Sequence, residues 1–483
     1  MSFVRTVPGA AFLLAAVAVG VVSFQSARAQ RASTPDWAAV DPETMQHFQA
    51  LLRLDTSNPP GNERLAANYL QSVLEREGIE SHTYELEAGR ANLVARLKGS
   101  GRRQPILFMG HTDVVTVDPR KWRFPPFSAT RDGGFIYGRG SVDDKPHVVA
   151  GLMTMILLKR LQVPLDRDVI FLAEAGEEGT SHVGIDFMLD KHESEIRAEY
   201  CLAEGGGVTR ADGVVKYATV QTMEKLPRSV ELTAHGTSGH GSRPLADNAI
   251  VHLSAAVAAV GAWRAPIRLN ATTREYFRRL AELSPPDEAA RYFAILEPSS
   301  SAAARAADDY FVAREPNHAS MVRTSVAPTI LSGGYRVNVI PSEAKATLDV
   351  RMLPDENPDE FLQRVRTVVN DPLIDVAFAA GHDERPAMRT GANLESEGFR
   401  TIESVIKKHY QTTVLPMMST GATDMAQLRA KGVQCYGVGP ATDREEASKG
   451  FGAHSDQERI LESELQRFVH FAWDAVYELA RAH

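Results

Sequence analysis

Five histidine and acidic side chains lie far apart along the chain, each followed by turn residues and each at the end of an apolar run typical of a strand. They are His111, Asp143, Glu178, Glu204 and His454. An α/β sheet presents its ligand-binding side chains at the carboxyl ends of its strands. Two imidazoles and three carboxylates suit a pair of zinc-class ions. The sequence therefore predicts an α/β fold in which distant strand ends converge on a two-metal site.

The length and charge of the chain narrow its class. Its 483 residues exceed the roughly 250–300 residues at which a single core stops growing, so at least two domains are expected. The net charge is -8 and no basic run is present, which argues against a nucleic-acid partner. Only two cysteines occur, Cys201 and Cys435, so a disulfide framework is excluded and both are expected to be small buried apolar residues.

Residues 1–29 have the pattern of a secretory signal peptide. Arg5 gives a positive start, an apolar run extends from Ala10 to Phe24, and Ala27-Arg28-Ala29 forms a small-x-small cleavage site before Gln30. The apolar run is shorter than the roughly 20 residues that a membrane span needs, so cleavage is favoured over an uncleaved anchor. We therefore expect a secreted or periplasmic protein that has no stable membrane span after cleavage.

The rest of the chain divides into two interleaved modules. Alternating strands and helices over residues 30–226 predict the first part of a catalytic domain, with a mostly parallel or mixed sheet covered on both faces. Half-exposed strands and amphipathic helices predict an α+β module over residues 227–390, with a helical insertion at about 264–323. The α/β pattern resumes over residues 391–483, so the second module is inserted into the first.

The periodicity of the sequence places the expected elements. For the α/β module we expect strands at Asn92–Leu97, Pro105–Met109, Asp168–Ala173 and Tyr200–Ala203, and helices at 42–53, 61–77, Val148–Leu161, Leu394–His409 and Glu462–Arg481. For the inserted module we expect strands at Ser229–Ala234, Ser325–Leu331, Ala344–Met352 and Ile374–Phe378, and helices at Asn248–Trp263 and Pro358–Val369.

Each candidate site residue also has a structural explanation when it is taken alone. His111 and Asp113 point to the same side of an extended segment, so Asp113 can support a metal-bound His111, although a lone histidine is usually not a ligand. Asp143, with Asp144, could simply cap the next helix. Glu177 and Glu178 could form a solvated acidic loop. The strong evidence for a two-metal site is the order in which all these motifs occur together along the chain.

These motifs resemble the dizinc metallopeptidase family that includes aminoacylase, carnosinase, carboxypeptidase G, carboxypeptidase S and the succinyl-diaminopimelate and acetylornithine deacylases. The resemblance covers nearly the whole mature chain. It rests on the segments at 57–61, 110–115, 138–145, 177–179, 239–244, 338–341, 349–351, 421–424 and 437–440, followed by His454. It implies a mixed-sheet zinc-peptidase catalytic domain with an inserted α+β lid and dimerisation domain.

The resemblance also implies a role for each matching residue. Asp143 bridges the metals, His111 and Glu204 complete one site, and Glu178 and His454 complete the other. Glu177 is the general base, and His240 on the lid binds the oxyanion. Asn338 and Arg351 match lid positions that hold the substrate, and Gly421 and Thr423 match a substrate-binding loop. His147 and His182 match no residue of the family pattern, and both are expected to be surface or capping histidines. The position just before His147 often holds glycine in that pattern.

The function implied is that of a secreted metal-dependent hydrolase that cleaves an amide bond next to a free carboxylate, as a carboxypeptidase or dipeptidase does. An N-acyl-amino-acid deacylase is the alternative, because the motifs do not separate the two substrates. A non-catalytic metal- or peptide-binding protein is a further alternative, which the intact Glu177 and five ligands argue against. Two divalent ions per chain are expected, zinc first and cobalt or manganese as alternatives, together with a homodimer formed through the lid.

Overall fold

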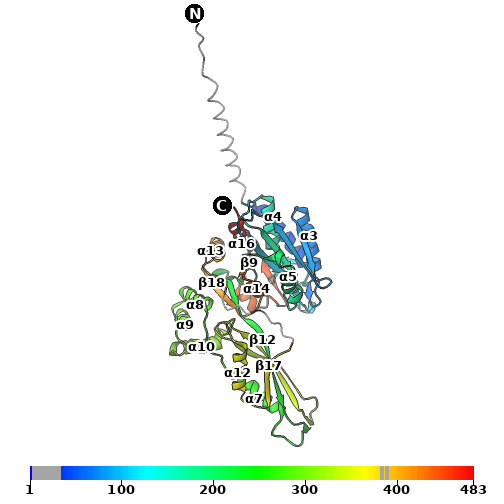
Figure 1. Cartoon of the computed structure of the whole chain (residues 1–483), viewed down its shortest axis with the longest axis vertical. Coiled ribbons are helices and arrows are strands. Elements are labelled where there is room, and N and C mark those ends of the chain that lie inside the picture. Colours follow the sequence, from blue (N-terminus) through cyan, green and yellow to red (C-terminus); the bar gives the residue numbers. More distant parts are fainter. Residues whose placement is uncertain (3–33, 381–385, 387–390, 483) are drawn as a thin grey trace.

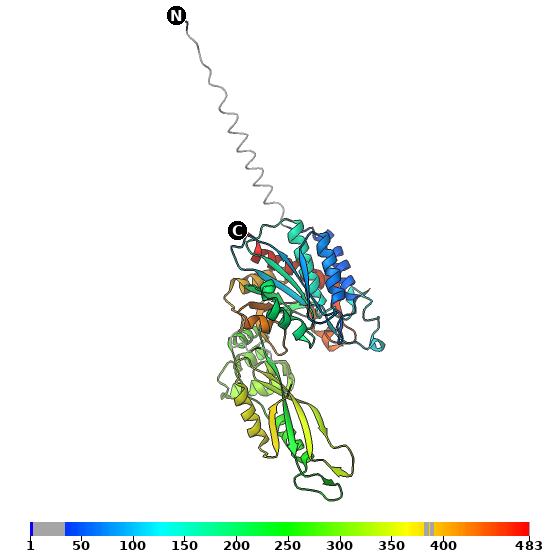
Figure 2. The ribbon, with the colours of Figure 1, turned by 45° about the vertical axis from the view of Figure 1, so that its right-hand side comes forward.

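The computed structural model describes residues 1–2, 34–380, 386 and 391–482 (Figure 1). The predicted signal peptide, apart from its first two residues, and the predicted boundary at 390 lie outside these ranges. Within them, no helix is both long enough and apolar enough to cross a bilayer. Two parts are visible: one is built on a large sheet, and the other extends from it as a narrower sheet with helices (Figure 2).

The large sheet has ten strands and mixes parallel with antiparallel pairs. The strands run in the order β2 (Ser81–Glu85), β3 (Ala91–Leu97), β8 (Val169–Glu174), β4 (Ile106–His111), β9 (Tyr200–Ala203), β19 (Gln434–Gly437), β11 (Val214–Glu224), β10 (Gly207–Ala211) and β20 (Ala441–Asp443), with β18 (Val414–Ser419) beside β11. The α/β class with a mixed sheet is therefore confirmed.

Helices cover both faces of this sheet, which explains why its central strands are continuously apolar. Phe108 of β4 packs into the core on one face, whereas Leu107 and Met109 pack on the other. The first face carries α2 (Trp37–Leu52), α3 (Arg64–Arg76), α4 (Lys145–Arg160), α13 (Glu397–Tyr410) and α16 (Glu462–Ala480). The second face carries α5 (Ile185–Lys191) and α14 (Met425–Ala430). Short helices α6 (Glu193–Ile196) and α15 (Arg444–Ser448) lie in connections.

Most expected elements lie within a few residues of their predicted bounds, and α2 departs furthest at its start. This helix begins at Trp37 rather than at residue 42, so that Pro42 lies inside it. Cys201 and Cys435 are both free and buried, as expected, and they are register partners on β9 and β19.

The second sheet, which we call the lid sheet, has four strands in the order β14 (Ser325–Gly333), β16 (Glu343–Met352), β12 (Leu226–His235) and β17 (Ile374–Phe378). One face packs against α7 (Ala249–Ala262) and α12 (Pro358–Val369). Buried and half-exposed residues alternate along β16, as expected for a sheet with one covered face. A small ribbon of β13 (Gly239–His240) and β15 (Val339–Ile340) accompanies this sheet.

Four helices follow α7 within residues 264–323, where the sequence predicts a helical insertion. They are α8 (Ala271–Leu283), α9 (Pro286–Ala294), α10 (Ala302–Arg314) and α11 (Pro316–Met321). Their aromatic core, which includes Phe277 and Phe311, also contains Leu415 and Met418 of β18. These helices therefore pack against the large sheet next to the point where the lid sheet begins (Figure 1).

Candidate metal centre

The structure brings the five predicted ligands together. Asp143 lies between the two histidines: its Oδ1 is 2.9 Å from Nε2 of His111, and its Oδ2 is 3.2 Å from Nε2 of His454. Oε1 of Glu178 lies 2.8 Å from Nε2 of His454, and Oε2 of Glu204 lies 4.0 Å from Nε2 of His111. The carboxylate of Asp143 thus faces two groups of side chains, His111 with Glu204 and His454 with Glu178, as a residue that bridges two ions would.

Neighbouring strands of the large sheet position three of these ligands. His111 ends β4, Glu178 follows β8, and Glu204 follows β9, and β4 pairs in parallel with the other two strands. Asp143 and His454 come from loops, so the expectation that every ligand ends a strand is wrong for them. His454 has a φ of 61°, and this left-handed backbone turns its side chain toward Glu178.

The electrostatics of the cluster suit cations. Burial raises the pKa of Glu204 well above its usual value, and the nearby carboxylates of Glu177 and Asp143 raise it further. Hydrogen bonds to Asp143 and Glu178 raise the pKa of His454 to about 10. Burial disfavours the charged form of His111, but its contacts with Asp113 and Asp143 outweigh burial and raise its pKa well above 6.5. Protons on the imidazoles thus balance the negative charge of the carboxylates. Bound metal ions would take the place of these protons.

Asp113 holds this cluster in two ways. Its backbone oxygen accepts a hydrogen bond from Nδ1 of His111 at 3.0 Å, so that Nε2 is directed to Asp143. Its buried carboxylate accepts the backbone N–H groups of Gly176, Glu177 and Glu178 at 3.0 to 3.2 Å. Asn58 adds a fourth hydrogen bond, at 2.7 Å. The carboxylate therefore fixes the acidic loop, and its Oδ1, 3.5 Å from Nδ1 of His111, orients the ring together with the backbone oxygen.

Two buried groups at the centre are not among the site residues predicted from the sequence. Glu458 is fully buried and accepts hydrogen bonds from Arg139, Gly140 and Val142 in the loop that leads to Asp143. Glu458 lies in a polar run, and such a run does not indicate a buried residue. The partners that bury it lie more than 300 residues away in the sequence.

His147 is the second such group, and its expected surface or capping place is wrong. Its side chain is buried on α4, contacts Asp144 through Nδ1, and donates from Nε2 to the backbone oxygen of Val438 at 3.0 Å. Asp144 itself offers ligand atoms near His111 and Glu204, within 4.8 Å of one another. His182 is exposed, as expected, and contacts Glu87.

The two predicted lid residues His240 and Asn338 lie side by side. Strands β13 and β15 pair His240 with Val339, and the N–H of Gly241 donates to the oxygen of Asn338 at 2.9 Å. Both side chains are exposed. Nδ1 of His240 accepts hydrogen bonds from the backbone N–H and the hydroxyl of Ser242.

The remaining predicted substrate contacts already have partners within the chain. Arg351 donates to Asp349 from Nε at 2.9 Å and from Nη2 at 3.3 Å. The Thr423 hydroxyl donates to the buried Glu224 at 2.8 Å, and Gly421 is exposed in the same loop. The roles of these residues in binding substrate stay predictions.

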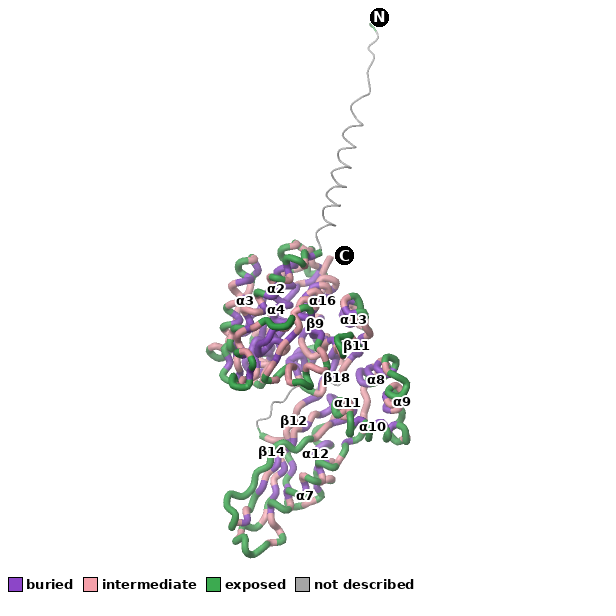
Figure 3. The backbone as a smooth tube through the Cα atoms, turned by 180° about the vertical axis from the view of Figure 1, so that it is seen from behind, coloured by how far each residue is buried: buried purple, intermediate pink, exposed green. Residues whose placement is uncertain are grey.

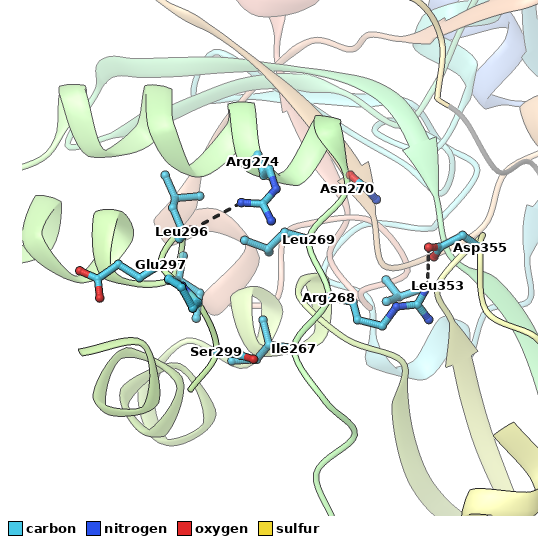
Figure 4. A pocket seen from close by; sticks show the side chains of 12 residues that line it. Ile267, Arg268, Leu269, Asn270, Arg274, Leu296, Glu297, Ser299, Leu353 and Asp355 are labelled. Atoms are coloured by element: carbon cyan, nitrogen blue, oxygen red, sulfur yellow. Dashed lines mark hydrogen bonds and ion pairs between the residues drawn. The ribbon is translucent and has the colours of Figure 1, made fainter. Parts of the chain in front are cut away.

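A cavity of 510 Å³ lies apart from this centre, between α8, the turn at 295–299 and the segment after β16 (Figure 4). Its lining contains none of the predicted site residues. Arg268 on its wall is neutralised by Asp355, and Arg274 points toward the backbone oxygen of Leu296. Nothing in this cavity resembles the chemistry of the five-ligand cluster.

Comparison with known proteins agrees with this geometry. The model of "Peptidase family M20/M25/M40" matches residues 107–478. The N-fatty-acyl-amino acid synthase/hydrolase PM20D1 of Xenopus tropicalis is 27% identical over 83% of this chain and 76% of its own length. A probable succinyl-diaminopimelate desuccinylase of Staphylococcus aureus (strain MSSA476) is 27% identical over 79% of this chain and 85% of its own.

Among solved structures, the M20 family metallo-carboxypeptidase Sso-CP2 of Sulfolobus solfataricus has the same fold, with a TM-score of 0.68 at 19% identity. The match covers 90% of this chain and 98% of that one. The family model spans most of the chain and includes the strands that converge on His111, Glu178 and Glu204. The chain therefore belongs to peptidase family M20/M25/M40 and is a hydrolase of amide or peptide bonds.

Proposed function

We propose that the protein uses two divalent ions to hydrolyse an amide bond next to a free carboxylate in a small substrate. The observation that carries this proposal is the position of Glu177, which is not needed as a ligand, beside five converging metal-ligand side chains. A protein that only binds metal or peptide has no need of this extra carboxylate. In support, Glu177 is half-buried, and its backbone N–H donates at 3.2 Å to the carboxylate of Asp113, the residue that also contacts His111.

The donor set fits two zinc-class ions. One set of ligand atoms is Oδ1 of Asp143 with His111 and Glu204, and the other is Oδ2 of Asp143 with His454 and Glu178. When bound, such ions polarise the substrate carbonyl and activate a water molecule. Zinc is the ion we propose, because imidazole and carboxylate ligands in this mixture suit it, and cobalt or manganese would share the same ligands.

The chain's own residues then divide the proton and charge transfers. Glu177 accepts a proton from the attacking water and delivers it to the leaving nitrogen, a contribution of typically about 10²–10⁴-fold in rate. His240 donates a hydrogen bond to the oxygen that gains negative charge once the lid lies over the site. Arg351 and Asn338 hold the substrate carboxylate, so Arg351 exchanges Asp349 for the substrate.

Peptides and N-acyl amino acids both meet this description. The relatives favour the N-acyl class as the second candidate, since one acts on N-fatty-acyl amino acids by name and another is named a desuccinylase. A substrate panel decides between them: metal-replete protein is assayed against dipeptides and matched N-acyl amino acids, with and without a chelator. Hydrolysis of one class that a chelator abolishes supports the proposal, whereas metal-independent hydrolysis or no hydrolysis of either class contradicts it.

We also propose that two copies of the chain pair through the lid sheet. Strand β14 is an edge strand, and its apolar Ile330 and Leu331 are 60% and 63% exposed (Figure 3). Tyr335 in the following loop is 82% exposed, and Val251 on the neighbouring α7 is 61% exposed. An unpaired edge beside exposed apolar side chains is a surface that native proteins otherwise avoid or cover. A second copy of the same edge covers it by symmetry.

Export is the last part of the proposal and rests on the pattern of residues 1–29. If the segment is cleaved, the purified product begins near Gln30 and is recovered outside the cytoplasm. Intact mass and N-terminal sequencing of the product check this. A product that retains Met1 would show that the segment is not removed.

A further inference from the structure

Two consecutive residues hold both ends of the loop between β18 and α14, which we call the β18–α14 loop. The backbone N–H of Lys225 donates to the oxygen of Ser419 at 3.0 Å. The carboxylate of Glu224 accepts the backbone N–H of Thr423 at 2.9 Å and its hydroxyl at 2.8 Å. Gly421, between these two ends, is exposed. The loop therefore has a fixed base and an exposed tip.

The side chain of Gln221 links this loop to the metal centre. Its Nε2 donates to Glu224 at 2.9 Å and to the hydroxyl oxygen of Thr423 at 3.4 Å. A side chain at Gly205 would meet Oε1 of the same amide at 2.0 Å, so the amide packs on the backbone that directly follows the ligand Glu204. Gln221 itself is fully buried. The β18–α14 loop is thus separated from a metal ligand by a single buried side chain.

The group that holds the loop at position 224 has to be a carboxylate. Oε2 of Glu224 accepts hydrogen bonds from Gln221, from the Thr423 hydroxyl and from Nη1 of Arg429, and Oε1 accepts the Thr423 N–H. An ionised carboxyl group offers acceptors only, whereas an amide has one oxygen and one NH2 group. Either orientation of an amide would turn its NH2 group against the N–H of Thr423 or against Arg429.

We propose that Glu224 is a positioning residue, which holds the β18–α14 loop so that its exposed tip contacts the substrate at the metal centre. This inference rests on the proposed function. Glu224 is the last residue of β11, and the lid sheet begins two residues later at Leu226. Pro227 in that lid strand is the register partner of Arg351. The residue that holds the loop is therefore joined, within four positions, to the strand pair that carries the proposed carboxylate contact.

The first test separates KM from kcat. In Glu224→Gln the loop loses its base while the metal ligands and Glu177 are unchanged. KM for whichever of N-acetyl-leucine and alanyl-leucine is hydrolysed therefore rises at least about tenfold, while kcat stays within about threefold of the wild type. The metal content also stays that of the wild type.

Glu356→Gln is the matched control for the loss of a buried charge. The side chain of Glu356 is 5% exposed, against 4% for Glu224, and it also accepts hydrogen bonds from arginine and from a threonine hydroxyl. It lies on the lid, away from the β18–α14 loop. A loss of stability is expected in both variants, whereas the rise in KM is expected only in Glu224→Gln.

Two further measurements do not depend on hydrolysis. The Thr423 N–H exchanges its hydrogen at least about tenfold faster in Glu224→Gln than in the wild type, because its buried acceptor is lost. Calorimetric titration of N-acetyl-leucine into metal-loaded protein carrying Glu177→Gln gives an affinity that Glu224→Gln weakens at least about tenfold. If Glu224→Gln does not fold, Glu224→Gln/Arg429→Met replaces it, since removing both partners of a buried ion pair is tolerated better than removing one.

These readouts separate failure of the inference from failure of the proposed function. If the wild type hydrolyses neither substrate but the differences in exchange and affinity hold, the reaction is wrong and the role of Glu224 stands. An unchanged KM and affinity, unchanged exchange at Thr423, or an equal rise of KM in Glu356→Gln overturns the positioning role. Loss of metal from Glu224→Gln also overturns it, because the effect would then act through the metal ligands.

Discussion

Glu458 accepts the backbone N–H of Asp143 at 3.1 Å, across 315 residues of sequence. The same carboxylate oxygen accepts the N–H of Val142 at 2.7 Å, and the other oxygen pairs with Arg139 at 2.6 Å. The residue that faces both histidines is thus held by a fully buried acid from the C-terminal part of the chain. The position of the bridging carboxylate depends on this contact between distant segments.

Substitution of Glu458 should therefore weaken metal binding. Glu458→Gln keeps the size of the side chain but removes the charge that Arg139 and three amides share, so the loop carrying Asp143 loses its anchor. We expect a loss of about 10–100-fold in metal affinity. Competition with a zinc chelator measures this. Glu462→Gln, which breaks the more exposed ion pair with Arg131, is the control and should change little. Unchanged affinity in Glu458→Gln would show that the loop is held by other contacts.

Glu177 and Glu178 should differ although they are adjacent. Glu178 contacts His454 at 2.8 Å, so Glu178→Gln should lose a metal ion. Glu177→Gln should retain both ions and lose at least about 10²-fold in kcat, because it removes only the proton acceptor. Metal content and kcat measured on the two variants form a matched pair. Wild-type turnover in Glu177→Gln would show that another group is the base.

Part of this centre could be predicted from the sequence because the signal is local. The apolar runs that become β3, β4, β8 and β9 end at or just before turn residues, so strand ends and ligands are visible together. The alternation of β12 and β16 likewise shows a sheet with one covered face. These patterns depend on residues a few positions apart.

The parts that could not be predicted depend on distant segments. Strand β11 is partly polar, and it is a strand because it pairs with β18, some 200 residues later, and with β10. Glu458 and His147 resemble surface residues until partners far along the chain bury them. Arg351 matched a substrate-binding position, but only the structure shows that Asp349 occupies its guanidinium.

The pairing of Arg351 with Asp349 yields a test of carboxylate recognition. In the wild type, a free-acid substrate should be cleaved with a kcat/KM about 10–100-fold higher than its C-terminal amide, the range expected for hydrogen bonds to a charged group. Arg351→Ala should remove this preference. Asp349→Ala, which frees the guanidinium without removing it, should retain or increase it. If Arg351→Ala keeps the wild-type ratio, this arginine serves only its ion pair on β16.

Lys225 should make stability depend on pH. Its ammonium group is buried beside the start of the lid sheet and donates to Ser320 and Ser325. Burial, and then the charges of Arg351 and Arg323, lower its pKa from 10.5 to about 7. Between these values the unfolded lysine keeps a proton that the folded lysine has released, so the free energy of unfolding rises with pH.

Lys225→Met should abolish this rise, which has a slope of up to about 1.4 kcal/mol per pH unit. Denaturant unfolding of metal-replete protein at several pH values from 7 to 10.5 measures the difference between variant and wild type. Lys408→Met, at an exposed lysine paired with Asp474, is the control and should leave the slope unchanged. Parallel curves for wild type and Lys225→Met would mean that Lys225 stays charged in the folded protein.

The exposed edge of the lid sheet predicts the oligomeric state. Stable interfaces bury about 1,200–2,000 Å² with an apolar centre, and β14, the loop that contains Tyr335, and α7 offer apolar side chains for such a surface. Light scattering should therefore give about twice the mass of one chain.

Leu331→Asp places a charge in the centre of this edge and should shift the protein to the mass of a single chain. The circular dichroism should not change, because the substituted side chain is 63% exposed and lies outside the core. Leu283→Asp, at an apolar residue of α8 that is 42% exposed, should leave the dimer intact. A wild-type mass of one chain, or a Leu331→Asp variant that remains dimeric, would contradict pairing through this edge.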